Sequence, residues 1–485
     1  MIAGFGLEVV RYYENIGVAL VQFPDPTVAA RLLAQSSVDY IEPDLGAAQL
    51  DLLPGSASTN SSAASTGTRV AAGAMMSMSQ TMPWGVTLVR APDAWPYSTG
   101  SVSRILIVDT GHERGHEDLP LVPLGNCMGA YGACDDPVYS PSGGIPHGTH
   151  VTGTAVALNN GIGVVGVAYG VPSSNLYVYS ACDPTIGGAG CPFAELIGAL
   201  NWAVPNLGSQ GVVNMSLGGP TYNQAFANAV AAASAAGHVL VASAGNDAVN
   251  ALRYPAAYSN VIGVAAVLPT KAFAATAAPC PFPYGGSNWG AHVDFVAPWY
   301  ALSTVPNSSY ADETTPPYWC GTSMAAPHVT GLAALVRTRY PSWSASSVFY
   351  RMRDTAEPLG PIGWDDHFGF GLIRAHLAVA FDRPVATPTI VAGKPRLSWP
   401  AIPFATEYRI YRRVTPTACP TWALWATVGG TSYTDASTNV TSFYGYDSAP
   451  TSQAAVSYYV TAFAEGVETV YYQFVTYLPN GALVC

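Results

Sequence analysis

The chain has 485 residues, of which 49% are apolar and only 10% are charged, and its formal net charge is −11. With two lysines, Lys271 and Lys394, and no basic run, it is a poor partner for nucleic acid or an anionic membrane surface. The length exceeds that of one ordinary domain and the apolar content excludes a disordered chain, so we expect two to four folded units.

The N-terminal sequence predicts two segments of different character. Residues 1–44 predict a small α+β unit, with a strand at 18–23, a short amphipathic helix at 26–33 and a closing strand at 38–44. Residues 45–79 are rich in Ser, Ala, Thr and Gly. Such a composition cannot bury a core, so we expect a flexible linker that is open to proteolysis.

Residues 80–382 alternate short apolar runs with helical ones, which is typical of a doubly wound α/β domain with a parallel sheet. The longest apolar stretch, 225–242, is mostly alanine and contains Asn228 and His238. It therefore lacks the roughly 20 strongly apolar residues of a membrane span. The predicted strands are Ile105–Val108, Leu176–Tyr179, Val212–Met215, Val239–Ala242 and Val261–Ala265.

The composition changes after about residue 384. We expect a linker at 383–394 and an all-β sandwich at 395–485, because this last region has strand-like runs without helical periodicity. Trp399, then Tyr408, then a late tyrosine-rich strand resemble a fibronectin type III domain. The strands are predicted at 396–399, 407–412, 431–435 and 457–462.

The cysteine pattern favours disulfides. Eight cysteines occur without a CxxC pair, which argues against a zinc site. They allow about 105 pairings, of which we favour the sequential one. An oxidising compartment follows, so we expect a secreted protein whose signal peptide is not present in this sequence. The predicted pairs are Cys127–Cys134, Cys182–Cys191, Cys280–Cys320 and Cys419–Cys485.

Three motifs carry groups suited to nucleophilic catalysis. A strand-like run ends in Asp109, His147 opens the sequence HGTHVTG, and Ser323 lies in GTSMAAPHVTG at the start of an Ala-rich helix. A serine at a helix start is usually a plain cap, but Asp, His and Ser in this chain order match one arrangement of the catalytic triad. All three motifs resemble those of the subtilisin-like serine proteases, and the resemblance covers residues 80–382.

This resemblance implies an endopeptidase that forms an acyl-enzyme on polypeptide substrates. Ser323 would be the nucleophile, His147 the general base and Asp109 its partner, and Asn246 would donate to the oxyanion beside the Ser323 backbone N–H. One segment would pair with the extended substrate and a second would face a substrate side chain. Small residues there would admit a bulky apolar group, and Asp247 at the rim a basic one, so we expect broad specificity. The two segments are Ser216, Leu217, Gly218 and Gly219, and Ala242, Ser243, Ala244 and Gly245.

The resemblance also implies a structural Ca²⁺ site. The spacing agrees with the family, including Gln80 just ahead of Pro83-Trp-Gly. Oxygen ligands in this number suit Ca²⁺. The ligands would be the side chains of Gln80, Asp118 and Asn160 and the carbonyls of Leu158, Ile162 and Val164.

Residues 1–44 resemble the latter part of the family's inhibitor-type propeptide and lack its first strand and helix. We therefore expect the sequence to begin after the natural N-terminus. The propeptide would inhibit a monomeric enzyme from within the same chain until self-processing removes it. An unrelated small α/β segment is the alternative.

Three other functions agree less well with the sequence than a serine protease does. An inert adhesion protein with a protease-like domain would normally lack one of the four catalytic groups, and all four are present. An esterase would show Gly-x-Ser-x-Gly after a strand. Two histidine pairs are possible metal ligands, but neither has a third ligand motif. For these we expect His150 to be a packed neighbour of His147, and the loop with His112 and His116 to be solvated.

Overall fold

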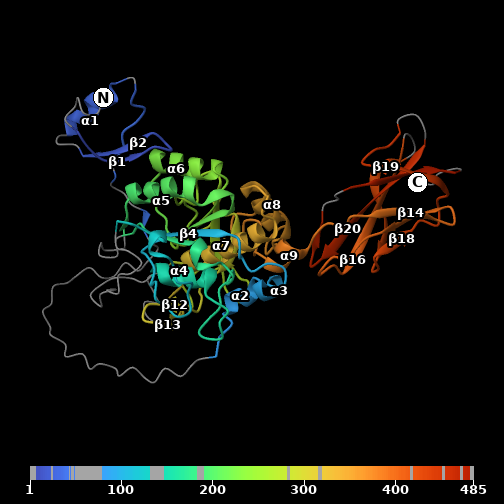
Figure 1. The fold of residues 1–485 in the computed structure, drawn as a ribbon, viewed down its shortest axis with the longest axis horizontal. Helices are drawn as coiled ribbons and strands as arrows, with labels where there is room; N and C mark the ends of the chain where they lie inside the picture. Colours follow the sequence, from blue (N-terminus) through green and yellow to red (C-terminus); the bar gives the residue numbers. More distant parts are fainter. Residues whose placement is uncertain are drawn as a thin grey trace. The chain divides into compact units, whose positions relative to one another are not determined.

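The computed structural model describes residues 7–22, 26–35, 37–42, 44, 48–49, 79–130, 147–182, 190–280, 285–314, 319–415, 419–450, 454–469 and 473–480. The chain forms two compact units, Met1–Ala375 and His376–Cys485 (Figure 1). In the described ranges, no helix combines the length and the apolar character that crossing a membrane requires.

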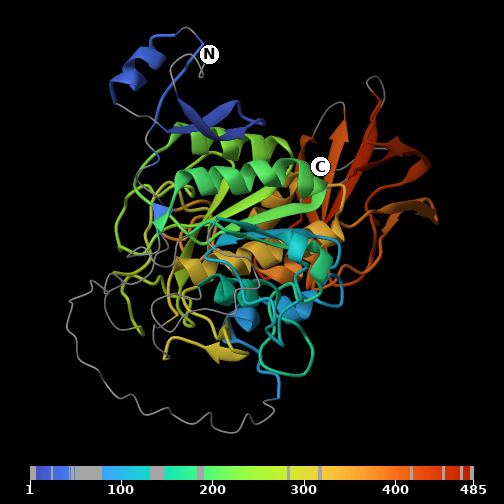
Figure 2. The same cartoon turned by 60° about the vertical axis from the view of Figure 1, so that its left-hand side comes forward.

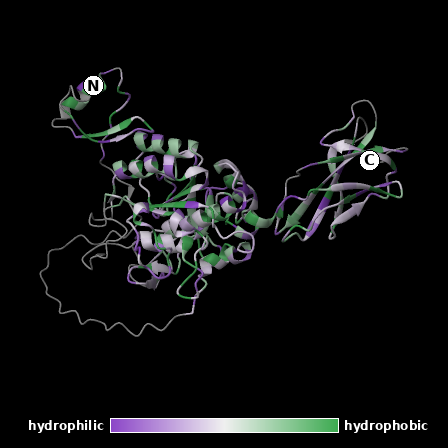
Figure 3. Ribbon diagram, in the orientation of Figure 1, coloured by the Kyte–Doolittle hydropathy of each residue, from purple (hydrophilic) through white to green (hydrophobic). Residues whose placement is uncertain are grey.

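The first unit is built on one seven-stranded sheet in which every neighbouring pair of strands is parallel. Its inner strands are buried along nearly their whole length and consist mainly of apolar residues, as a sheet covered on both faces requires (Figure 3). The predicted doubly wound fold and its predicted strands are confirmed. In sheet order the strands are β11 (Phe295–Pro298), β10 (Val261–Val267), β9 (Val239–Ser243), β8 (Gly211–Met215), β4 (Arg104–Asp109), β6 (Leu176–Ser180) and β5 (Cys127–Gly129).

Helices cover both faces of this sheet. The helices α5 (Phe193–Asn206) and α6 (Gln224–Ala235) lie together on one face, and α4 (His147–Val156) and α7 (Thr322–Arg339) lie on the other (Figure 1 and Figure 2). Because α7 packs against both the sheet and α4, it is buried all round from Thr322 to Arg337. The remaining elements of this face and its edges are α2 (Trp84–Leu88), α3 (Ala91–Ala94), α8 (Ala345–Thr355), β12 (Ser303–Val305) and β13 (Ser309–Ala311).

The N-terminal residues form a hairpin and a helix. The strand β1 (Glu8–Tyr13) pairs antiparallel with β2 (Val18–Gln22), and α1 (Pro26–Leu33) follows. The closing strand predicted at 38–44 is wrong, because none of the described residues of that range lies in a strand. A strand needs a neighbour for its backbone groups. Here the contacts come instead from the side chains of Glu42 and Asp44, which bind α6 and α5.

The predicted linker 45–79 lies outside the described residues apart from residues 48–49 and 79. Residues Ala48–Gln49 form a short strand, β3, which pairs antiparallel with β7 (Gly190–Cys191). This part of the linker sequence therefore lies along the first unit as an added strand.

Two of the predicted disulfides, Cys182–Cys191 and Cys280–Cys320, are confirmed. The first ties β7 to the chain just beyond β6, and the second ties residue 280 to the segment that leads into α7. The predicted pairs Cys127–Cys134 and Cys419–Cys485 each include a cysteine outside the described residues.

The second unit is antiparallel β structure, as predicted. Trp399, Tyr408 and Tyr458 lie in its core, and so do Leu377 and Phe381. Because the side chains of Leu377 and Phe381 complete this core, the second unit begins at His376, before the predicted start of the sandwich at residue 395. The strand β14 lies within the predicted linker 383–394. Its likeness to a fibronectin type III domain stays a prediction. Its helix is α9 (Ala375–Ala380), which starts at the last residue of the first unit, and its strands are β14 (Thr387–Val391), β15 (Lys394–Ser398), β16 (Glu407–Thr415), β17 (Cys419–Val428), β18 (Ser432–Thr434), β19 (Val440–Tyr446), β20 (Ala455–Ala464), β21 (Val467–Glu468) and β22 (Val475–Pro479).

Replacing Cys280 and Cys320 together by serine is expected to lower the free energy of unfolding by about 4 kcal/mol, because the crosslink closes a long loop and restricts the unfolded chain. The matched replacement of Cys182 and Cys191, which close a much shorter loop, should cost about 2.5 kcal/mol. Denaturant unfolding of both variants, each carrying Ser323→Ala to exclude the expected self-digestion, measures the difference. An equal loss in the two would contradict the loop-length argument.

Candidate active site

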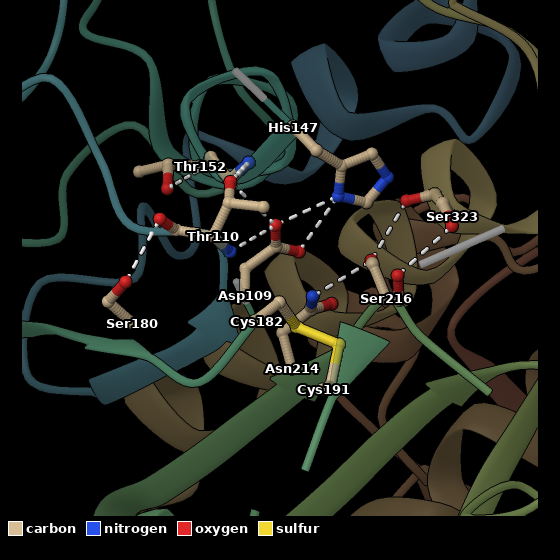
Figure 4. Close-up of polar contacts among 11 residues, drawn as sticks. Asp109, Thr110, His147, Thr152, Ser180, Cys182, Cys191, Asn214, Ser216 and Ser323 are labelled. Atoms are coloured by element: carbon tan, nitrogen blue, oxygen red, sulfur yellow. Dashed lines mark hydrogen bonds and ion pairs between the residues drawn. A yellow bond between two sulfur atoms is a disulfide. The ribbon is translucent and has the colours of Figure 1, made fainter. Parts of the chain in front are cut away.

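Three polar side chains from distant parts of the sequence meet at the carboxyl edge of the sheet (Figure 4). Asp109 is the last residue of β4, His147 is the first of α4 and Ser323 is the second of α7. The carboxyl ends of parallel strands share one edge, so the segments that follow them converge there. All three residues are buried, with at most 1% of their surface exposed.

The carboxylate of Asp109 holds the imidazole of His147 by its Nδ1. Both carboxylate oxygens lie close to this nitrogen, at 2.9 and 3.0 Å, and the backbone N–H of Thr110 donates to the same carboxylate at 2.8 Å. With Nδ1–H donated to Asp109, the neutral ring carries its lone pair on Nε2. Helix α4 comes this close because residue 148 is glycine: a Cβ there would lie 2.0 Å from the carbonyl oxygen of Gly111.

The hydroxyl of Ser323 is held by Ser216 rather than by His147. Ser323 Oγ donates to the Ser216 carbonyl at 3.1 Å, and Ser216 Oγ donates to the Ser323 carbonyl at 2.9 Å (Figure 4). Among the described residues, no group hydrogen-bonds to Nε2 of His147. Behind this pair, Asn214 donates to Ser216 Oγ and Thr330 donates to Asn214, so a buried chain of hydrogen bonds supports the serine.

The side chain of Asn246 is hydrogen-bonded to the start of α7. Its side-chain oxygen accepts from both the backbone N–H and the hydroxyl of Thr322, at 2.8 and 2.9 Å, and the same hydroxyl accepts from the backbone N–H of Gly245. These bonds fix the orientation of the amide. Its nitrogen lies beside Gly321, where a Cβ would be 2.8 Å away and where φ is +148°, so glycine suits this position in both respects.

The two predicted substrate segments continue from the ends of β8 and β9. The backbones of Gly219 and Tyr254 exchange hydrogen bonds of 2.9 and 2.8 Å, and Ala242 pairs with Met215 across the strands. All members of both segments are buried. They are Ser216, Leu217, Gly218 and Gly219, and Ala242, Ser243, Ala244 and Gly245.

The histidines that the sequence offered as possible metal ligands, His112, His116 and His150, are buried. His150 stacks on Trp319 at 4.4 Å between ring centres and contacts the carbonyl oxygens of Ala301 and Ala311. Burial lowers the pKa of His150 to about 3, so the ring is neutral. The loop with His112 and His116 was expected to be solvated, but both side chains are buried. Strand β13 accounts for the burial of His116, because the ring packs against Tyr310 and contacts the Ser309 carbonyl oxygen at 3.1 Å.

The six predicted calcium ligands lie together. The carbonyls of Leu158 and Val164 converge on one atom, the amide nitrogen of Gln80, at 2.6 and 2.8 Å. One oxygen of Asp118 accepts from the Val164 N–H at 2.7 Å, and its other oxygen is buried without a hydrogen-bond partner. Burial raises the pKa of Asp118 to about 7. Asn160 completes the loop by accepting from the Ile162 N–H.

The sequence analysis assigned no role to three residues near the site, Asn214, Thr330 and Arg253. Asn214 is two residues before the predicted Ser216 and so shares one face of the extended chain with it, and Thr330 lies two helical turns beyond Ser323 on the same face of α7. These spacings could have indicated the first two residues. Arg253 lies in a loop and has no such pattern.

Comparisons with known proteins agree with this geometry. Residues 102–371, more than half of the chain, match the model of the subtilase family. Subtilisin of Bacillus pumilus is 35% identical over 305 residues, which are 62% of this chain and 99% of that protein. Subtilisin E of Bacillus subtilis (strain 168) is 34% identical over 305 residues (62% and 71%), and an alkaline protease of Shouchella clausii is 37% identical over 303 residues (62% and 70%). The chain thus belongs to the subtilase family and is a subtilisin-like serine endopeptidase.

Proposed function

We propose that Ser323, His147 and Asp109 act as a catalytic triad on peptide bonds. The observation that carries the proposal is the buried Asp109–His147 pair, which leaves Nε2 of the ring as a proton acceptor at the helix start that bears Ser323. For attack, the Ser323 hydroxyl turns from the Ser216 carbonyl towards Nε2. His147 takes its proton as Oγ bonds to the peptide carbonyl, then gives it to the leaving amine, and water later hydrolyses the acyl-enzyme.

Asn246 and the backbone N–H of Ser323 stabilise the negative oxygen of the tetrahedral intermediate. The Asn246 oxygen is engaged by Thr322, so the amide nitrogen is the end of this side chain that serves as donor. A donor that is already fixed needs no reorganisation as charge develops. Substrates are polypeptides bound mainly through their backbone beside Ser216–Gly219, which supports a broad range of sequences.

Residues 1–44 act as a propeptide that binds the enzyme through its two outer helices. The Asp44 carboxylate accepts from the backbone N–H of Ala194 in the first turn of α5, and Glu42 accepts from those of Gln224 and Ala225 in the first turn of α6. Carboxylates are favoured at helix N-termini because they satisfy unpaired N–H groups and the helix dipole. Tyr13 adds a buried hydrogen bond to the Ala194 carbonyl.

The chain that follows the proposed propeptide includes the short strand β3. Its partner strand β7 is joined by Cys191 to Cys182, and the Cys182 N–H donates to the carbonyl of Asp109. A chain that pairs with β7 therefore lies on an element anchored to the triad. This supports inhibition by occupation of the cleft, followed by self-processing within 45–79. The disulfides support secretion into an oxidising medium, where the enzyme acts as a monomer in this proposal.

The residues at the predicted calcium site fit such an ion. Two backbone carbonyls already converge on one point, and the unpartnered Asp118 oxygen is the kind of buried acceptor that a cation satisfies. A half-turn of the Gln80 amide would present its oxygen in place of its nitrogen. Bound Ca²⁺ would supply positive charge to the Asp118 carboxylate and tie residue 80 to the loop 158–164, with no part in the chemical step.

Replacing Ser323 by alanine is expected to lower casein hydrolysis by at least about 10⁴-fold, because no other group can form the acyl-enzyme. Residues 1–79 should then stay covalently attached, which mass spectrometry of the purified chain would show. The exposed Ser346→Ala is the control and should mature normally. Hydrolysis by Ser323→Ala at the unaltered rate would refute the assignment of the nucleophile.

Replacing Asn246 by alanine should lower kcat by about 10²- to 10³-fold, the cost known for removing this kind of donor in subtilisin, with little change in KM. The reason is that the donor acts on the transition state and not on the bound peptide. Steady-state kinetics on one peptide substrate would measure both constants. Asn206→Ala, at an exposed residue, is the control, and a change confined to KM would contradict the oxyanion role.

Removing Ca²⁺ is expected to lower the melting temperature by several degrees, since an ion held at 100 times its Kd contributes about 2.7 kcal/mol. Calorimetry of the Ser323→Ala protein with excess Ca²⁺ and with EDTA measures the shift. In Asp118→Asn the shift should be much smaller, whereas the surface change Asp354→Asn should retain it. Identical melting with Ca²⁺ and with EDTA would exclude the site.

A further inference from the structure

Arg253 lies between the two segments predicted to face the substrate. Next to it, Tyr254 exchanges backbone hydrogen bonds with Gly219. A Cβ built on Gly218 would lie 3.8 Å from Cβ of Arg253, and one built on Gly245 would lie 2.9 Å from its Cγ. The stem of the arginine therefore fills space next to both segments, and the absence of a side chain at Gly245 makes room for it. The sequence alone suggested small residues in these segments with Asp247 at the rim.

The guanidinium of Arg253 is partly engaged. Its Nε, at 3.1 Å, and its Nη2 both donate to a single oxygen of Asp247, which also accepts from the Asn288 amide. Within the described residues, the Nη1 group makes no hydrogen bond. The arginine side chain is 17% exposed and that of Asp247 is 52% exposed. One edge of the guanidinium thus has unused donors, and its counter-ion stands mostly in water.

The other polar groups here are compatible with an added negative charge. His292 lies close enough for Arg253 to influence it, and burial, reinforced by Arg253, lowers the pKa of His292. The ring is therefore neutral, and its Nε2–H donates to the Ala244 carbonyl oxygen, 3.1 Å away. Among the described residues, Asp247 is the anion that Arg253 binds. Its own carboxylate is half exposed, so water can solvate it when another carboxylate takes its place.

We propose that Arg253 is a specificity-determining residue that favours an acidic side chain on the substrate residue whose carbonyl Ser323 attacks. A carboxylate can take two parallel hydrogen bonds from a guanidinium, which apolar and basic side chains cannot. A substrate lysine would instead be repelled by Arg253 and would meet an Asp247 oxygen that already accepts three hydrogen bonds. This inference rests on the proposed function, because it assumes that these segments bind the substrate.

The test compares peptides that differ only at that residue, with Glu, Gln, Leu, Phe or Lys. For the unaltered mature enzyme, kcat/KM for Glu should exceed that for Gln by about five- to tenfold, and Lys should be the poorest. In Arg253→Met, which keeps an apolar stem beside the glycines, the Glu:Gln ratio should fall to one or below. In Asp247→Asn it should rise, because the competing carboxylate is gone.

The Glu:Gln ratio is independent of the fraction of active enzyme, so partial misfolding of a variant does not affect it. Arg353→Met, which removes an arginine that is ion-paired with Asp354 outside the site, is the control and should leave the ratio unchanged. The same ratio in Arg253→Met as in the unaltered enzyme would overturn this inference alone. Failure of the unaltered enzyme to cleave any of the peptides would overturn the proposed function and this inference together.

Discussion

The hydrogen bonds that fasten the first turn of α7 to the ends of β8 and β9 are the interaction on which the rest of the site depends. Thr322 binds Asn246 and Gly245, and Ser323 binds Ser216 in both directions. Because α7 is buried on every side, its first turn cannot move without disturbing the core. The proposed nucleophile, the proposed oxyanion donor and both predicted substrate segments are thereby held at one rigid junction, whereas Asp109 and His147 come from the end of β4 and the start of α4.

Placing these polar groups in the interior has an energetic cost that the structure offsets group by group. A buried carboxylate such as that of Asp109 is tolerated when it accepts several hydrogen bonds, here from the His147 ring and the Thr110 backbone. The chain from Thr330 through Asn214 to Ser216 does the same for the serine. Nε2 of His147, by contrast, is buried without a hydrogen-bond partner among the described residues. In the proposed mechanism this atom gains its partner when it accepts the Ser323 proton.

Much of this could be predicted from the sequence, because the motifs are local. Asp109, His147, Ser323 and the parallel strands follow from short patterns with a defined period or order. The predictions that were wrong concern features that depend on contacts with residues distant in the sequence. Residues 38–44 have a strand-like pattern, but no adjacent strand pairs with them, and the polar loop around His112 and His116 is covered by other parts of the fold. No sequence pattern indicated a role for Arg253, because that role depends on its position beside Gly218 and Gly245, which lie elsewhere in the chain.

The Cys280–Cys320 disulfide ends three residues before Ser323, next to the joint described above. In a reducing cytoplasm this bond would not form, and the segment entering α7 would have one anchor fewer. The redox state of the surroundings would thus affect how firmly the first turn of α7, and with it Ser323, is held. Reduction of this one bond is a chemical means of loosening the segment beside Ser323 without changing any residue of the site.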